Sequence, residues 1–289
     1  RISAVLGMPF EAVACDRRGR MDLDSLSARL SRGGVGTVVA TLGTTATGSV
    51  DPLPEILSLA RRRGARVHVD AAYGGYYTLA ANLAPFARDA FDRIGEADSI
   101  VIDPHKHGLQ PYGCGCVLFR DPEVGRFYKH DSPYTYFSSE ELHLGEISLE
   151  CSRPGAAAVA LWATQRLLPL EPGGEFARCL EASREAALAL HARLSNRARW
   201  IPGHEPELDI VVWAARGQST AESSARARRI FDEAARRDLH LALAELPGAF
   251  FGLDAERVTC LRSVLMKPEH RDWIDRIGTI LEDAADAAG

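Results

Sequence analysis

The sequence predicts an α/β fold in which a mostly parallel sheet is followed by a smaller α/β domain. Two observations predict it. Between residues 35 and 102, short apolar runs rich in β-branched residues alternate with helical stretches, which is the rhythm of a parallel sheet. From about residue 172 onward, the spacing of strands and helices changes. We therefore expect two domains, residues 1–171 and residues 172–289.

The first strand and the first helix are predicted from composition and from proline positions. Val35 to Thr41 (VGTVVAT) is apolar and β-branched, which suits a strand buried on both faces. Pro52 and Pro54 favour a helix start before residues 55–63, and Gly64 ends that helix. The same reasoning predicts strands at 65–70, 99–102 and around 116–119, and a helix at 85–94.

The later part of the chain contains one long loop and the second domain. Residues 127–149 combine close tyrosines, a proline and mixed polarity, which is typical of a long functional loop. Helices are predicted at 155–168 and 175–198. In the second domain, predicted strands at 208–214, 239–245 and 258–266 alternate with predicted helices at 220–236 and 269–287.

Composition excludes several classes of function. Of the 289 residues, 46% are hydrophobic and 25% charged, and the formal net charge is −5. This charge gives no basic excess for binding nucleic acid or an anionic membrane. No apolar run approaches the roughly 18 residues of a membrane span, and nothing resembles a signal peptide. The six cysteines form no CxxC pair, which favours reduced thiols in a cytoplasmic protein.

Polar side chains gather where the predicted parallel strands end. Ligands of such sheets sit outside the carboxyl ends of the strands, and Thr45, Asp70 and Lys106 follow three of those ends. A partly buried lysine can form a Schiff base with an aldehyde. A carboxylate in the same crevice can hold a proton on a pyridine nitrogen, and Ala72 leaves room for a flat ring. Together these residues suggest a pyridoxal phosphate site.

Two other interpretations stay open at this point. A strand-end aspartate is often a turn former and a lysine after a histidine is often merely exposed. The chemical alternative is a metal-dependent hydrolase, because His68, Asp70, His105 and His107 form a carboxylate–imidazole set. Lys106 between the two histidines and Pro104 before them argue against the metal.

Three ordered motifs carry a resemblance to a known family. "ATLGTTATGSVDPLPEI", "VHVDAAYGGY" and "DPHKHGLQPYG" resemble the pyridoxal-phosphate-dependent amino acid decarboxylases of the aromatic and glutamate type. "LECSRPGAAAVALWATQRLLPL" is similar to a helix of the bacterial tyrosine decarboxylases in that group. The resemblance covers residues 40–170. It implies the aspartate aminotransferase fold (fold type I), pyridoxal 5′-phosphate as cofactor, and decarboxylation of an L-amino acid, with tyrosine favoured over a glutamate-like substrate.

The resemblance also implies roles for single residues. Lys106 would bind the cofactor aldehyde, Asp70 would hold the proton of the pyridine nitrogen, and Ala72 would pack on the ring. Thr45 would bond near the ring hydroxyl and His105 would contact the phosphate. Arg153 falls in the family's Ser-Arg segment near the substrate.

The long loop carries the remaining catalytic expectation. It would be the mobile catalytic loop, with Tyr134 as the favoured proton donor and Tyr136 as the second choice.

The family's active site lies at a dimer interface, so we expect a homodimer. The family's N-terminal phosphate cup and its ring-stacking side chain are not found here. We therefore expect residues 1–171 to be the C-terminal part of the cofactor-binding domain, its N-terminal part being missing or supplied by another chain. Another pyridoxal-phosphate-dependent lyase or an aminotransferase is the alternative on this fold.

Overall fold

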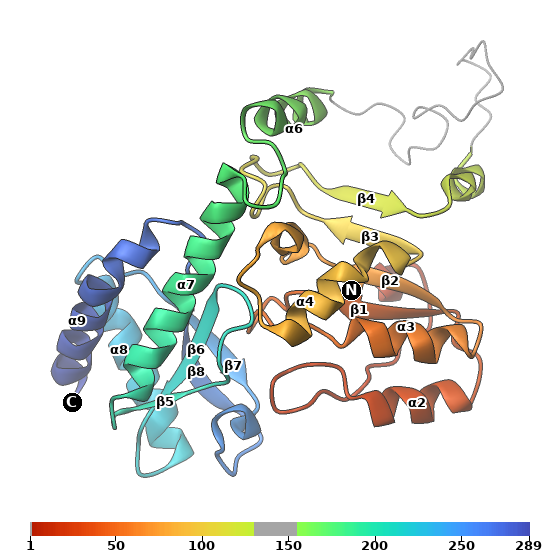
Figure 1. The fold of residues 1–289 in the computed structure, drawn as a ribbon. Helices are drawn as coiled ribbons and strands as arrows, with labels where there is room; N and C mark the ends of the chain where they lie inside the picture. The colour runs from red at the N-terminus through yellow and green to blue at the C-terminus, as the bar shows by residue number, and fades with distance from the viewer. Residues whose placement is uncertain (1, 130–154) are drawn as a thin grey trace.

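A computed structural model describes residues 2–129 and 155–289 of the chain. Two four-stranded sheets with helices packed on them make up its described part (Figure 1). We call the part built around the first sheet the first lobe, and the part from residue 175 onward the second lobe. The predicted α/β fold is confirmed.

The first sheet places the carboxyl ends of three parallel strands side by side. Its order is β1-β2-β3-β4, formed by Thr37–Thr41, Arg66–Asp70, Ser99–Ile102 and Cys116–Phe119. Strands β1, β2 and β3 run parallel, and β4 runs antiparallel to β3. Thr41 pairs with Asp70, and Asp70 pairs with Val101. The loops that follow β1, β2 and β3 therefore leave the sheet at one edge.

Helices cover one face of this sheet. They are α2 (Leu23–Ser31), α3 (Leu53–Arg61) and α4 (Pro85–Asp92). Side chains that alternate along β1 and β2, such as Val38 and Val67, are buried with the apolar faces of these helices in one core. The prediction that the first strand is buried on both faces is wrong for the described residues. The side chain of Val39, on the opposite face, is 45% exposed because nothing described covers it.

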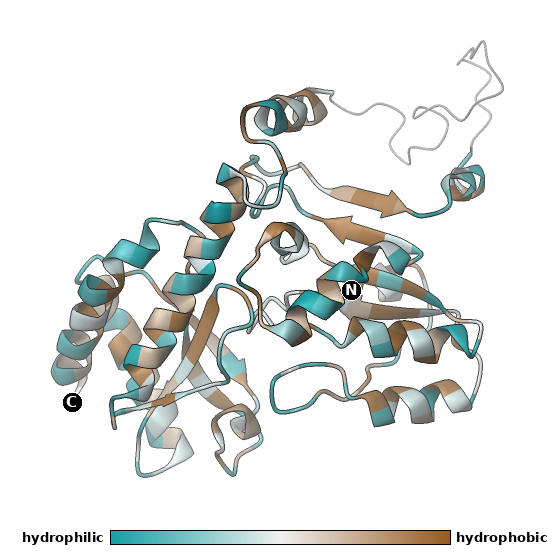
Figure 2. Cartoon of the chain, viewed as in Figure 1, coloured by the Kyte–Doolittle hydropathy of each residue, from teal (hydrophilic) through white to brown (hydrophobic). Residues whose placement is uncertain are grey.

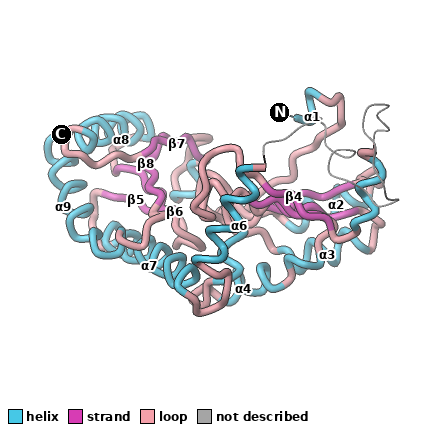
Figure 3. Tube along the Cα trace, turned by 90° about the horizontal axis from the view of Figure 1, so that it is seen from above, coloured by secondary structure: helices cyan, strands magenta, loops and turns pink. Residues whose placement is uncertain are grey.

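The second lobe is a separate antiparallel sheet with three long helices. Its strand order is β5-β6-β8-β7, formed by Trp200–Pro202, Ile210–Ala215, Val258–Val264 and Ala242–Leu246. Helices α7 (Glu175–Ser195), α8 (Thr220–Ala235) and α9 (His270–Ala288) share a core with one face of this sheet. Figure 3, seen from above, shows the two sheets side by side along the molecule. Two further helices are α1 (Ile2–Val5) and α6 (Ala156–Leu167).

Strand β6 joins the two lobes because both of its faces are buried. On one face, Val211 and Trp213 pack in the core of the second lobe. On the other face, Ile210 and Val212 pack in the core of the first lobe. Figure 2 shows the hydrophobic character of the central strands. A continuous apolar core therefore crosses the predicted boundary at residue 172, and that boundary stays a prediction.

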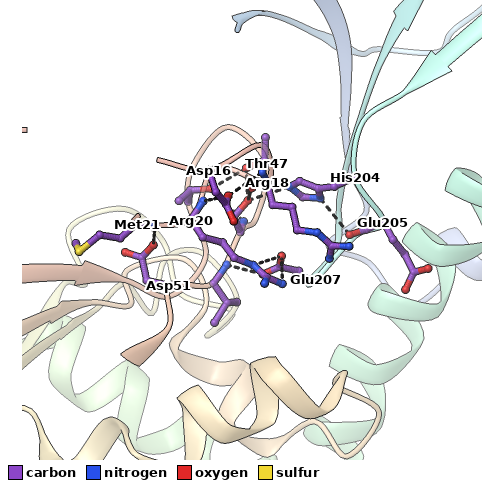
Figure 4. Close-up of polar contacts among 12 residues, drawn as sticks. Asp16, Arg18, Arg20, Met21, Thr47, Asp51, His204, Glu205 and Glu207 are labelled. Atoms are coloured by element: carbon purple, nitrogen blue, oxygen red, sulfur yellow. Dashed lines mark hydrogen bonds and ion pairs between the residues drawn. The ribbon is translucent and has the colours of Figure 1, made fainter. Parts of the chain in front are cut away.

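Polar side chains add a second connection between the lobes (Figure 4). The guanidinium group of Arg20 lies 2.6 Å from Glu207, and Glu207 also accepts a hydrogen bond from the Val50 amide at 2.7 Å. The second buried carboxylate of this cluster, Asp51, accepts from the amides of Met21 and Thr41. Burial raises the pKa of Asp51, partly offset by these two hydrogen bonds.

No helix in the described ranges combines the length and the apolar character that crossing a membrane requires.

Candidate active site

The structure brings Asp70 and Lys106 to neighbouring strand ends. Asp70 is the last residue of β2, and Lys106 lies in the turn that follows β3. The two segments remain hydrogen-bonded beyond the sheet, because the Asp103 amide donates to the Ala72 carbonyl at 3.2 Å. Both residues therefore follow adjacent parallel strands at one edge of the sheet, and their joint role in a site stays a prediction.

Lys106 is held in a tight turn and pairs with a nearby carboxylate. Its amide donates to the Asp103 carbonyl at 2.9 Å, and its Nζ lies 2.8 Å from Oδ2 of Asp103. The lysine side chain is 33% exposed and the aspartate side chain 19%. The amine is thus partly shielded while it stays accessible to a small molecule.

Asp70 keeps one carboxylate oxygen available. Its Oδ1 accepts from the Ala72 amide at 3.1 Å, and within the described residues Oδ2 has no hydrogen bond. His68 lies on the same face of β2 and its Nδ1 is 2.8 Å from the Ser99 hydroxyl group. Burial lowers the pKa of His68, and the charge of Asp70 opposes that shift. Asp70 can therefore accept a proton-bearing nitrogen from a ligand.

The loop after β1 carries Thr45 and is held by the second lobe. Arg262 of β8 donates from Nη2 to the Thr45 carbonyl at 2.6 Å and from Nε to the Ala46 carbonyl at 3.0 Å. The Thr44 hydroxyl group accepts from the Ser49 amide at 3.0 Å and closes the loop. Thr45 itself is exposed, and its predicted contact with a ring hydroxyl stays a prediction.

His105 is anchored by the segment that precedes β4. Its Nδ1 donates to the Cys114 carbonyl at 3.1 Å, and its ring lies 5.1 Å from the Tyr112 ring. The predicted contact of His105 with a phosphate stays a prediction. Tyr134, Tyr136 and Arg153 lie outside the described residues.

The side chain of His107 is buried in the interior instead of lying at the strand ends with Lys106. Its side chain is 1% exposed and lies 2.9 Å from Asp209, a fully buried carboxylate of the second lobe. Sequence reasoning missed Asp209 and Arg262. The available signal was weak: a lone acid stands directly before an apolar strand, and an arginine lies within another.

The structure does not support the metal alternative. His107 is bonded to Asp209, His105 to a backbone carbonyl group, and His68 to Ser99. Across residues 2–129 and 155–289, no three histidine, cysteine, aspartate or glutamate side chains are arranged to hold a metal ion.

Comparison with known proteins identifies the family. The pyridoxal-dependent decarboxylase conserved domain matches residues 1–216, about three quarters of the chain. The chain belongs to the pyridoxal-dependent decarboxylase family. The resemblance seen in the motifs is thereby confirmed, and pyridoxal phosphate is the cofactor of this domain.

Characterised relatives in this family differ in substrate. The chain is 39% identical over 151 residues to aspartate 1-decarboxylase of Aliivibrio fischeri, a match that spans 50% of this chain and 27% of the relative. It is 30% identical over 230 residues to L-tyrosine decarboxylase of Enterococcus faecium, spanning 65% of this chain and 38% of that protein. The matches thus span less than half the length of these two relatives.

Solved structures show the same fold. Catharanthus roseus tryptophan decarboxylase with L-tryptophan has a TM-score of 0.77 at 18% identity, covering 96% of this chain and 57% of that one. Sphingosine-1-phosphate lyase of Burkholderia pseudomallei has a TM-score of 0.76 at 20% identity, covering 99% and 60%. At these identities the likeness establishes the fold alone, which is fold type I.

The described residues fit the cofactor of the family. A primary amine and a carboxylate with an available oxygen, Lys106 and Asp70, are the two groups that a pyridoxal site needs from these strand ends. Glycines keep the backbone close around them. A Cβ atom on Gly108 would lie 2.7 Å from the Cα atom of Pro104, so the turn that carries Lys106 has no room for a side chain there.

Proposed function

We propose that this chain is part of an enzyme that decarboxylates an L-amino acid with pyridoxal 5′-phosphate. The observation that carries the proposal is the pair Lys106 and Asp70 at adjacent strand ends in a member of this family. When bound, the cofactor supplies an electron sink for the pair of electrons that carbon dioxide leaves behind.

Each residue at the strand ends would have a separate role. Lys106 would hold the cofactor aldehyde carbon until the substrate amine replaces it. Asp70 would keep a proton on the pyridine nitrogen, since an ion pair at hydrogen-bond distance in a partly buried site is worth several kcal/mol. Ala72 would leave space for the ring, Thr45 would bond near the ring hydroxyl, and His105 would contact the phosphate.

Residues outside the described ranges would complete the site. A tight clamp on the α-carboxylate would stabilise the ground state more than the transition state. Arg153 is therefore expected to orient the substrate or support the cofactor phosphate. Tyr134, with Tyr136 as second choice, would donate its phenol proton to the carbon that loses carbon dioxide.

The substrate is proposed as an aromatic amino acid such as tyrosine, with a glutamate-like acid second. Relatives with names for tyrosine, aspartate and 2,4-diaminobutyrate all match this chain, so the family alone does not select among them. A screen for amine product over the twenty amino acids, extended to 2,4-diaminobutyrate, decides the substrate. Amine from an aspartate-like substrate only would contradict the aromatic proposal.

The assembly is proposed as a homodimer in the cytoplasm. Apolar side chains of β4 and α6, among them Phe119 and Trp162, are 41% and 60% exposed, as an uncovered contact surface would be. The described cysteines are all free, which suits a reducing compartment. A fully active monomer in light scattering would contradict the dimer.

Attachment of the cofactor to Lys106 tests the function. After borohydride reduction, pyridoxal phosphate should be found on Lys106 in the wild type and should be lost, with turnover, in Lys106→Ala. The chain has only two other lysines, Lys129 and Lys267, so peptide mass analysis assigns the site. Attachment at either of those residues would overturn the assignment.

A second candidate is another pyridoxal-phosphate-dependent lyase or an aminotransferase. The observation that favours it is the fold shared with a sphingosine-1-phosphate lyase. Product analysis separates the cases: a decarboxylase gives carbon dioxide and amine, and an aminotransferase gives a keto acid. A carbon–carbon lyase releases an aldehyde without carbon dioxide.

A further inference from the structure

Asp209 is a buried carboxylate that reaches from the second lobe to both site loops of the first. It precedes β6, is fully buried, and is fixed there because the Leu265 amide donates to its carbonyl at 2.9 Å. Its Oδ1 accepts from the Tyr73 hydroxyl group at 2.5 Å, and its Oδ2 lies 2.9 Å from Nε2 of His107. Tyr73 follows Asp70 by three residues, and His107 follows Lys106 by one.

Both ring nitrogens of His107 face oxygen atoms. Its Nδ1 lies 2.9 Å from the Tyr73 carbonyl oxygen, which can only accept a hydrogen bond. Its Nε2 faces a carboxylate oxygen of Asp209, which also accepts when ionised. This geometry allows both ring nitrogens to donate, as they would in an imidazolium ion paired with a carboxylate. Burial raises the pKa of Asp209, but the charge of His107 and the hydrogen bonds from His107 and Tyr73 outweigh it and hold that pKa below its usual value.

The groups around this pair are neutral phenols and one cation. The rings of Tyr73 and Tyr77 meet the imidazole edge-on at centroid distances of 4.6 and 5.3 Å. Burial, followed by the charge of Asp209, raises the pKa of both phenols well above their usual value, so they stay neutral. Arg262 of β8 supplies the further positive charge near Asp209. With so little exposure, the hydrogen bonds of the pair are stronger than they would be in water.

We propose that Asp209 is a positioning residue that sets the spacing between Lys106 and Asp70. The Asp209 carboxylate holds the loop after β2 through Tyr73 and the turn after β3 through His107. A third hydrogen bond, between His107 and the Tyr73 carbonyl oxygen, joins the two loops directly. The second lobe thereby fixes the two loops that carry the lysine and its partner acid. The inference rests on the proposed function, since it assigns the reason why these two loops must be held.

Asp209→Asn tests the clamp in the full chain. An amide has one acceptor oxygen and one donor nitrogen, so it cannot accept a hydrogen bond from both loops, and it can bond His107 only by donating to a neutral ring. The rate of Lys106 attachment is measured against pyridoxal 5′-phosphate concentration by borohydride quenching. A displacement near 1 Å costs roughly 100-fold in rate. The maximal rate should therefore fall about 10- to 100-fold, while the half-saturating concentration stays unchanged because non-covalent binding is intact.

Glu207→Gln is the matched control. Glu207 is two residues earlier, is 4% exposed and also joins the lobes, but it contacts Arg20 and the amide of Val50, which follows the loop after β1, and neither the loop after β2 nor the turn after β3. Its attachment rate should stay within twofold of the wild type. An equal fall in both variants, or no fall in Asp209→Asn, would overturn the positioning role. If Asp209→Asn does not fold, Tyr73→Phe removes one arm of the clamp, and an unchanged rate there would overturn it instead.

Nitrogen NMR of histidine-labelled wild type gives a readout that a merely structural contact would not. The His107 signals, assigned by their loss in His107→Gln, should show an imidazolium ion at pH 7. A neutral ring would overturn the proposal. If the whole enzyme of which this chain is part takes up no cofactor on Lys106, the proposed function fails. The NMR result still decides whether the buried ion pair exists.

Discussion

Gly108, the residue after His107, lies where the turn that carries Lys106 packs closely against Pro104 and Tyr76. A Cβ atom placed on it would lie 2.7 Å from the Cα atom of Pro104 and 2.7 Å from Cζ of Tyr76, whereas ordinary contact begins at 3.4 Å. Pro104 opens the same turn, and Tyr76 is buried. Restoring ordinary contact with Pro104 in Gly108→Ala therefore requires a shift of about 0.7 Å.

The size of the effect follows from that displacement. Misplacing a reacting group by about 1 Å can cost roughly 100-fold in rate, so 0.7 Å should cost about 10- to 100-fold in cofactor attachment and turnover. Overpacking a buried site costs about 1–3 kcal/mol. At about 2–4 °C per kcal/mol for a protein of this size class, the melting temperature should fall by roughly 2 to 12 °C.

The assay compares Gly108→Ala with Gly95→Ala. Gly95 is exposed, and a Cβ atom on it would meet nothing within 4 Å. Attachment of pyridoxal phosphate to Lys106 and thermal unfolding are measured for both variants. Gly95→Ala should match the wild type in both measurements. Wild-type attachment and stability in Gly108→Ala would refute the claim that the turn is closely packed.

Three further outcomes are expected. Asp70→Asn should keep the cofactor attached to Lys106 but lower amine production by orders of magnitude, and near-normal turnover would exclude the proton-holding role. The pKa of Asp209 lies below its usual value of 3.8, so its ionised form stabilises the fold above that pH, and this stability is lost as the pH falls through the lower, folded-state value. The difference in unfolding free energy between wild type and Asp209→Asn should then shrink between pH 5 and pH 3 in urea titrations; a constant difference would contradict the shift. Tyr134→Phe should still release carbon dioxide, but the carbon that is left unprotonated should react with dissolved oxygen and give aldehyde, ammonia and peroxide in place of amine. Unchanged amine yields in both Tyr134→Phe and Tyr136→Phe would remove the loop tyrosines from the mechanism.

Local patterns were enough to predict most elements of the sheets. The β-branched run before Thr41 and the alternation in residues 66–70 gave strands within two residues of those observed. Helix α2 was missed because its serines weaken the apolar pattern, although Asp22 caps it by accepting from the Ser25 amide. Strand β5 was missed because it has three residues and ends in Pro202.

Some residues of the candidate site could be predicted from the local sequence, and others depend on contacts between distant parts of the chain. Asp70 and Lys106 follow strands, so their strand-end position could be predicted from the chain itself. Asp209 lies 102 residues from His107, and Arg262 lies 217 residues from Thr45. The hydrophobic pattern along the chain cannot predict these contacts, because they depend on how β6 and β8 pack against the first lobe. The orientation of His107 toward the interior was hidden for the same reason.

The ion pair between Arg20 and Glu207 has a consequence for protein synthesis. The two residues are 187 positions apart, and the Val50 amide depends on the same carboxylate. At about 5–20 residues per second, a ribosome needs roughly 10 to 40 s to travel that distance. Strand β6, whose Ile210 and Val212 pack into the core of the first lobe, emerges after a similar delay. Part of the apolar core of the first lobe is therefore exposed during this time. The first lobe can finish folding only after the second lobe has left the ribosome.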